Sequence, residues 1–437
     1  MVDFIATLPH ELAEKILSYL TASELSKAGC VNKLWREKTS GSSLWLHHCM
    51  VRGWFKYGVT FDLCSENVSQ GSSHSISGTS PIFDLEVPLE SSLPPIKKWK
   101  AVFIKTHHLL RNWEKGRYLV APILRGHSDQ VSAFDSNGHV LVSGSCDRSL
   151  RIWDLHKYVC LFKIEGHSDV ITAIKFKGNI IVTGCADSGI RVYDSTTGQI
   201  LQSFFGHTGS VDKLEFDGET IISVSSDKTV RVWSVPDDRQ MYILRGHTDE
   251  IESLAVHGSL ALTGSWDNTL ILWNIAEGHG VHSLMGHTEV VNCCQFDDQK
   301  IISGSADSTL KIWQTKTGEC VRTLEGHTGE VYCLVYNNAV IASGSSDSTV
   351  RIWSHAGELM YTLREHLGVV RCLHIDEHKL VSGGDQKKIV IWNYRMGRKY
   401  NVVHRQPTRL HLMQVTETKL ITASPEKPGT ITVLCYW

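Results

Sequence analysis

The chain has 437 residues, a formal net charge of −2 and an ordinary apolar content, so it can form one large core with a small appendage. Charges of both signs are interspersed, which argues against binding to nucleic acid or to an anionic membrane. The twelve cysteines include no C-x-x-C pair, and the first 20 residues carry too many charges for a secretory signal. We therefore expect a soluble protein of the cytoplasm, the nucleus or both.

Residues 1–57 are expected to form a small helical domain. In LPHELAEKILSYL, which begins at Leu8, apolar residues recur at helical spacing. Thr21 and Glu24 form a capping-box pair that would begin a second helix. A segment this short has room for only a thin core, so part of its apolar surface is expected to bind a partner.

This segment resembles the F-box, because LPHELAEKILSYL, VNKLWRE and SLW follow in the order and spacing of that family. The resemblance implies a surface that binds a Skp-type adaptor. Carried over residue by residue, that surface consists of Leu8, Pro9, Leu12, Ile16, Leu17, Leu20, Leu25, Val31 and Trp35. The alternative is a small helical hairpin that packs on the rest of the chain.

Two segments connect this domain to the remainder. Residues 58–95 are rich in Ser, Gly and Pro and lack a sustained period, which predicts a flexible segment. Residues 96–116 return to helical spacing and resemble the linker helix of F-box/WD-repeat proteins.

From residue 117 to 437 the chain is repetitive. Gly-His pairs end at His127 and then at every fortieth residue up to His327, and an aromatic residue stands 26 positions after each histidine. Three short runs of period two lie within each unit, separated by Gly, Asp, Asn and Ser. Strands this short and regular predict a closed all-β array.

The pattern of GH, then S/T-G-S-x-D, then W-D resembles the WD repeat, whose unit forms one blade of a propeller. In that family a histidine, an aspartate, a Ser or Thr and a tryptophan form a hydrogen-bonded network. The first unit offers His127, Asp147, Ser143 and Trp153, and the third to sixth units repeat this set. Ser, His and Asp also suggest a catalytic triad, but a network present in every blade is structural.

Two units depart from the pattern, and an eighth is degenerate. The second ends in Tyr193, and the seventh has Gln386 where Asp is expected, so both blades should be looser. The motif KLITA, at 419–423, marks the eighth unit, which lacks an outer strand. We therefore predict an eight-bladed propeller in which strand 117–124 completes the C-terminal blade. Seven blades are the alternative, if the last unit only caps the array.

An F-box ahead of WD repeats is typical of substrate receptors of Skp-cullin-F-box ubiquitin ligases, and this chain most resembles their eight-bladed branch. The resemblance implies binding of a Skp-type adaptor, a cullin-RING core behind it, and target proteins that go on to ubiquitination and proteasomal degradation. The competing interpretation is a WD-repeat scaffold that assembles complexes without a ligase. No dimerising helix is visible before the F-box, so we expect a monomer.

Family resemblance also locates targets on the narrow face of the propeller. The expected substrate-binding residues are Asp212, Glu250, Glu252, Trp266, Asn292, Tyr332, Arg371, Arg409 and His411. The acidic members would repel a doubly phosphorylated ligand. We expect a ligand with a basic or aromatic portion beside Trp266 and Tyr332 and an acidic end near Arg371; alternatively, these charges only solvate the face.

No enzyme motif is found in the sequence. It contains no P-loop, dinucleotide fingerprint or zinc spacing, and HELAE lacks the second histidine of a zincin. A cluster of His279, His282 and His287 is interpreted as coincidence, because His287 belongs to the repeat network. We expect a non-catalytic protein with no cofactor and no metal.

Overall fold

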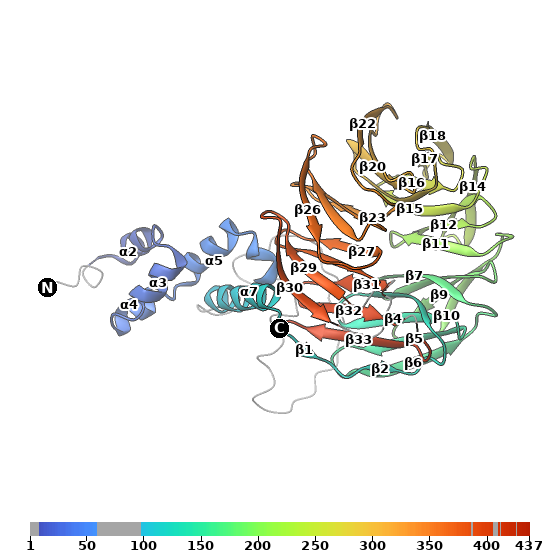
Figure 1. The fold of residues 1–437 in the computed structure, drawn as a ribbon. Helices are drawn as coiled ribbons and strands as arrows, with labels where there is room; N and C mark the ends of the chain where they lie inside the picture. The colour runs from blue at the N-terminus through green and yellow to red at the C-terminus, as the bar shows by residue number, and fades with distance from the viewer. Residues whose placement is uncertain (1–7, 59–97, 386–387, 405–409, 411, 425) are drawn as a thin grey trace. The chain divides into compact units, whose positions relative to one another are not determined.

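The computed structural model describes residues 8–58, 98–385, 388–404, 410, 412–424 and 426–437 (Figure 1). The chain divides into two compact units, Met1–Asn112 and Trp113–Trp437. Within the described residues, no helix combines the length and the apolar character needed to cross a bilayer.

The first unit is helical. Its elements are α2 (His10–Leu17), α3 (Ala22–Ala28), α4 (Lys33–Lys38), α5 (Ser42–Val51), the 3-10 helix η1 (Trp54–Gly58) and α7 (Lys98–Lys115), whose last three residues belong to the second unit. The predicted capping box is confirmed, since the Thr21 hydroxyl accepts from the Glu24 amide and the Glu24 carboxylate accepts from the Thr21 amide. The expected linker helix is present as α7.

Aromatic residues form much of the core of this unit. The Trp45 and Phe103 rings, from α5 and α7, meet edge to face with centroids 5.0 Å apart, and Trp54 lies 5.0 Å from the same phenylalanine. The Trp45 indole N–H donates to the Thr39 carbonyl over 2.7 Å. A thin core of this kind leaves other apolar side chains of the short helices at the surface.

The second unit is a propeller of eight antiparallel blades, seven with four strands from consecutive segments of chain (Figure 1). Blades 1 to 4 comprise β3 (Val131–Ser136), β4 (Val140–Ser145), β5 (Ser149–Asp154), β6 (Val159–Glu165); β7 (Ile171–Lys177), β8 (Ile180–Cys185), β9 (Ile190–Asp194), β10 (Ile200–Phe204); β11 (Val211–Phe216), β12 (Thr220–Ser225), β13 (Thr229–Ser234), β14 (Arg239–Arg245); and β15 (Ile251–His257), β16 (Leu260–Ser265), β17 (Leu270–Asn274), β18 (His279–Leu284).

Blades 5 to 7 continue the same order. They comprise β19 (Val291–Phe296), β20 (Lys300–Ser305), β21 (Leu310–Gln314), β22 (Cys320–Leu324); β23 (Val331–Tyr336), β24 (Ile341–Ser345), β25 (Thr349–Trp353), β26 (Leu359–Arg364); and β27 (Val370–Ile375), β28 (Leu380–Gly384), β29 (Lys388–Asn393), β30 (Arg398–His404). The first strand of each blade contacts that of the next, and these inner strands form a ring. The faces of adjacent blades pack together, as where Val182 and Val192 of blade 2 meet Trp233 of blade 3.

Blade 8 is built from both ends of the second unit. Its strands β31 (Leu412–Val415), β32 (Lys419–Ala423) and β33 (Thr430–Cys435) come from the C-terminus, and β1 (Leu119–Val120) and β2 (Leu124–Arg125) both pair with β33. The eight-bladed fold and its closure are thus confirmed. The closing strand is interrupted after Ala121, where Pro122 has no N–H to donate to a sheet.

Trp113 secures this closure from the end of α7. Its ring stacks on Tyr436 with centroids 3.5 Å apart, and its indole N–H donates to the Glu417 carbonyl over 2.8 Å. The Lys379 ammonium lies 4.2 Å from the centre of the same ring. The start of the second unit is therefore fixed to its last blade.

Candidate functional site

The predicted adaptor-binding residues divide into an exposed and a buried group. Leu12, Ile16 and Val31 are 53%, 43% and 63% exposed, and Pro9 is also exposed. Leu8, Leu20 and Trp35 are partly buried. Leu17 and Leu25 lie in the core of the first unit, so the surface of this structure does not include them.

Within residues 8–58, three exposed large apolar residues were missed by the sequence analysis. Tyr19, Met50 and Val51 are all largely exposed. A usable signal was present, since Tyr19 continues the i, i+4, i+7 series that runs from Leu12 through Ile16. These three residues and Leu12, Ile16 and Val31 are together called the apolar surface of the first unit.

On the propeller, Trp266 is a predicted substrate-binding residue with a large, exposed aromatic side chain. It is 50% exposed, and its indole N–H donates to the Glu252 carboxylate over 3.2 Å. Glu250 is exposed in the same blade. Asp212, in blade 3, is half-buried and accepts a hydrogen bond from the Ser210 hydroxyl over 2.8 Å. One exposed and two partly buried carboxylates and an exposed indole therefore lie on blades 3 and 4.

Arg371, which the sequence analysis placed near an acidic part of the ligand, is partly buried and already has partners in the propeller. Its Nε donates to the Asp385 carboxylate over 3.3 Å, and its guanidinium lies 5.2 Å from the centre of the Tyr332 ring. Asn292 is also engaged, since its amide donates to the Val331 carbonyl over 3.1 Å. Arg409 and His411 lie outside the described residues.

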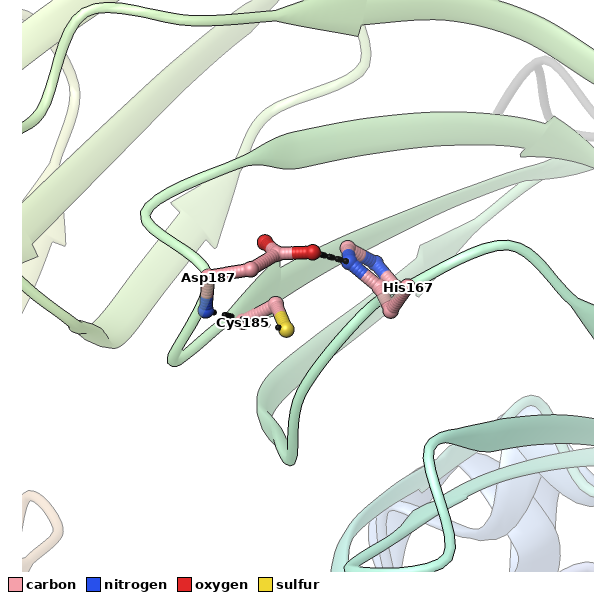
Figure 2. A group of neighbouring side chains, drawn as sticks. All are labelled: His167, Cys185 and Asp187. Carbon is pink, nitrogen blue, oxygen red and sulfur yellow. Dashed lines mark hydrogen bonds and ion pairs between the residues drawn. The ribbon is translucent and has the colours of Figure 1, made fainter.

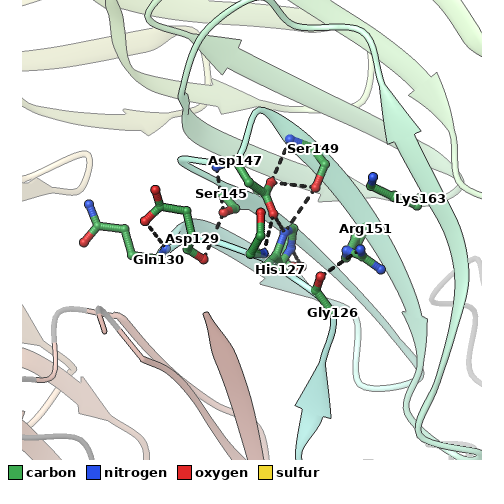
Figure 3. Close-up of polar contacts among 12 residues, drawn as sticks. Gly126, His127, Asp129, Gln130, Ser145, Asp147, Ser149, Arg151 and Lys163 are labelled. Atoms are coloured by element: carbon green, nitrogen blue, oxygen red, sulfur yellow. Dashed lines mark hydrogen bonds and ion pairs between the residues drawn. The ribbon is translucent and has the colours of Figure 1, made fainter. Parts of the chain in front are cut away.

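The repeated network of the blades has the predicted connections. In blade 1 the Trp153 indole N–H donates to Ser143 Oγ over 2.9 Å, and His127 Nε2 lies 2.8 Å from the same oxygen. His127 Nδ1 lies 3.0 Å from the Asp147 carboxylate (Figure 3). Blades 3 to 6 form the same network, with members His207, Ser223, Asp227, Trp233; His247, Thr263, Asp267, Trp273; His287, Ser303, Asp307, Trp313; and His327, Ser343, Asp347, Trp353.

The surroundings of His127 and Asp147 determine the protonation state of each. Burial lowers the pKa of His127, although the Asp147 charge opposes the shift. Burial alone would raise the pKa of Asp147, but hydrogen bonds from Ser149 and from the Ser128 amide lower it to about 2. A neutral imidazole then donates from Nδ1 to the carboxylate and accepts from Ser143 at Nε2, so every donor is satisfied. Ser143 is also fully buried, so it cannot act as a nucleophile on a substrate.

In blade 2, His167, Cys185 and Asp187 place their possible ligand atoms within 4.8 Å of one another (Figure 2). The Cys185 sulfur accepts from the Asp187 amide and donates to the Asp169 carbonyl, as Ser145 does with Asp147 and Asp129 in blade 1. Burial raises the pKa of the thiol to about 12. A thiolate is the form that binds metal, so this group does not fit a metal site.

Arg191 gives a second reason why His167, Cys185 and Asp187 do not fit a metal site. Its Nη1 donates to the Asp187 carboxylate over 3.1 Å and contacts His167 Nδ1, so a guanidinium already occupies the place where a cation would bind. His287 takes part in the blade 5 network, as interpreted from the sequence, while His282 bonds to the Lys316 carbonyl and His279 is paired with Glu277. These histidines have separate structural partners.

Family models match both units. The F-box-like model matches residues 5–51, and the model for the WD domain, G-beta repeat, matches residues 120–154, 158–194, 198–234, 238–274, 278–314, 318–354 and 357–393. The WD-repeat family model thus matches the first seven blades. The eighth, which the KLITA motif predicted, has no match to this family model and is present in the structure, closed by β1 and β2.

Several curated relatives are similar over about a third of the chain. The probable E3 ubiquitin ligase complex SCF subunit scon-2 of Neurospora crassa is 25% identical over 34% of this chain and 30% of its own length. F-box/WD repeat-containing protein 7 of Drosophila melanogaster is 29% identical over 34% and 10%, and F-box/WD repeat-containing protein pof1 of Schizosaccharomyces pombe is 29% identical over 34% and 31%. The matched region is thus less than a third of each relative.

The crystal structure of the computationally designed Ika8 protein is similar in fold. It superposes with a TM-score of 0.68 at 28% identity, over 72% of this chain and 98% of that chain. With seven family matches along the propeller and an F-box-like match before them, the chain belongs to the WD-repeat family and is an F-box/WD-repeat protein.

Proposed function

We propose that this protein is the substrate-recognition subunit of a Skp-cullin-F-box E3 ubiquitin ligase. Its first unit binds a Skp-type adaptor and through it the cullin-RING core, and its propeller presents target proteins for ubiquitination and proteasomal degradation. In this role the chain itself is non-catalytic. We further propose that it acts as a monomer in the cytoplasm or the nucleus.

One observation carries the proposal: the F-box-like unit exposes apolar side chains that a small isolated domain would otherwise bury. Leu12, Ile16 and Val31 are about half exposed or more, and the three additional residues of the apolar surface are more exposed than Ile16. Exposed apolar groups of this number are typical of a protein-binding surface. The names of several fungal relatives, which call them SCF subunits, support the same partner.

The test is calorimetric titration of the purified chain with a Skp-type adaptor. A triple variant, Leu12→Ser, Ile16→Ser and Val31→Ser, is expected to weaken binding about 100-fold or more, because each residue buries apolar area in the complex. Light scattering of the free chain in the same buffer tests the monomer.

The matched control is Val159→Ser with Leu161→Ser, two apolar residues of β6 that are also nearly half exposed. This variant should bind the adaptor as the wild type does. If folded wild-type chain does not bind the adaptor, the ligase proposal fails and a WD-repeat scaffold takes its place. If the control loses binding equally, the apolar surface of the first unit is not the contact.

A further inference from the structure

The second residue of each inner strand lies at a seam between blades. In blades 1, 2 and 5 this residue donates a hydrogen bond to a backbone carbonyl of the next blade: Ser132 to Ile171, Thr172 to Val211, and Asn292 to Val331. These side chains stabilise the ring by linking successive inner strands. Their donor groups are therefore committed to the fold.

Blades 3 and 4 have carboxylates at the same position. Asp212 is the second residue of β11, and Glu252 is the second residue of β15. An ionised carboxylate has no hydrogen to donate, so neither residue can make the seam bond of Ser132 or Asn292. At two adjacent seams an acceptor thus stands where other blades have a donor. The hydrogen bond from this side chain to the next inner strand is therefore lost.

The two carboxylates also influence each other. Burial raises the pKa of Asp212, and the charge of Glu252 raises it further. The Lys213 ammonium is 3.9 Å from Glu252, but both side chains are roughly half exposed, so this pair is weak. A cation from a ligand would relieve the repulsion between Asp212 and Glu252.

Trp266 adds an aromatic surface to this pair. Its ring is 50% exposed and is oriented by its hydrogen bond to Glu252, and the exposed carboxylate of Glu250 is in the same blade. An indole face attracts ammonium and guanidinium groups and packs against the aliphatic stems of Lys and Arg. The one arginine expected to bind an acidic ligand, Arg371, is paired with Asp385.

Building on the proposed function, we infer that the propeller recognises a basic, unphosphorylated segment of its target. A Lys or Arg side chain of that segment binds Asp212 and Glu252 and packs on Trp266. The charge of this surface favours such a ligand over a phosphorylated one, because a phosphate would meet three carboxylates on blades 3 and 4.

The experiment uses the full chain bound to its adaptor and two immobilised libraries of short random peptides. The libraries differ only in one fixed central residue, which is arginine in the first and phosphoserine in the second. We expect retention on the arginine library to be about fivefold higher and to fall as salt is added. Asp212→Asn with Glu252→Gln should abolish the difference, and Trp266→Ala, at an exposed position, should reduce it.

The matched control is Glu277→Gln with Asp298→Asn, which removes the same charge from exposed loop residues of blades 4 and 5 and should leave retention unchanged. A preference for phosphoserine, equal retention on both libraries, or an arginine preference that survives the double variant would overturn the inference. Adaptor binding, measured on the same samples, separates this failure from failure of the proposed function.

Discussion

Blades 1 and 7 differ in one part of the shared network. Blade 1 has the complete chain from Trp153 through Ser143 and His127 to Asp147. In blade 7 the Trp392 indole N–H donates to Ser382 over 2.8 Å and His366 Nε2 lies 2.7 Å from that oxygen. His366 Nδ1 has no partner among the described residues, and the expected aspartate is replaced by Gln386, which lies outside them.

The comparison shows that the network has two separable halves. The half formed by Trp, Ser and His holds the second and third strands of a blade to the incoming loop, and it is present in both blades. The half formed by His and Asp fixes the turn, and blade 7 forms all four strands without that aspartate. A catalytic constellation would not tolerate such a loss, whereas a stabilising one does at some cost in free energy.

Removing the histidine from each blade tests these halves most directly. His127→Ala leaves a cavity and removes bonds to Ser143 and Asp147, which should lower the free energy of unfolding by about 3 kcal/mol. His366→Ala leaves a similar cavity, but among the described residues it removes a bond to Ser382 alone, so the free energy of unfolding should fall by about 1 kcal/mol less. Urea unfolding, with the m value compared between variants, measures both.

Asp147→Asn is the control for this pair, because it weakens the turn around His127 and leaves the bonds of Ser143 to Trp153 and His127 in place. Equal losses for the two histidine variants would mean that the link between His and Asp contributes nothing, and the proposed division of the network would be wrong.

A smaller loss of stability is expected when the pH is lowered. Burial and the nearby charge of Lys388 lower the pKa of His366 to about 4, against about 6.5 for an unfolded histidine. The unfolded chain therefore binds more protons between these values, so stability holds above about pH 6.5 and falls as the pH decreases toward 4. The loss from this residue should be roughly 1–3 kcal/mol.

Thermal unfolding of the wild type and of His366→Gln across this pH range measures the effect, since the variant lacks the titrating group. The difference between their midpoints should narrow as the solution is acidified. Exposed His107 provides the control, because His107→Gln should leave the pH dependence of the wild type unchanged. A constant difference between wild type and His366→Gln would contradict the prediction.

Much of this fold was predictable because the repeat fixes register. Once His127 and Trp153 are aligned with their counterparts, the strands between them follow from position, and the resemblance to the WD repeat assigns the bonds of the network. The capping box at Thr21 was predictable for a similar reason, since its partner is three residues away. Local spacing is sufficient to predict a contact where the two interacting residues lie within one unit of the pattern.

Packing and charge pairing are what the pattern leaves open. Helical spacing marks Leu17 and Leu25 as apolar, but only packing shows that they are core residues while Leu12 and Ile16 are exposed. The pairing of Arg371 with Asp385 joins β27 to the bend after β28, and its effect on ligand choice depends on side-chain geometry. Surface charge can be located from the sequence, but its pairing cannot.

The smallest expected effect concerns blade 2, where Tyr193 replaces the tryptophan. Thr183 is fully buried and bonded to His167 Nε2 over 2.7 Å, as Thr263 is to His247 in blade 4. Thr263 also accepts the Trp273 indole N–H over 2.9 Å. Tyr193→Trp should supply the same donor to Thr183 and raise the free energy of unfolding by about 1 kcal/mol, measured by urea unfolding.

Arg191 decides whether this gain is realised, because its guanidinium now contacts His167 and Asp187. In blade 1 the equivalent Arg151 coexists with Trp153, since its Nη2 donates instead to the Gly126 carbonyl over 2.8 Å. Arg191 can adopt that arrangement beside a tryptophan. In a Thr183→Val background the replacement should give no gain, because the acceptor is missing. If Tyr193→Trp is equally stabilising there, the gain comes from packing and not from the network.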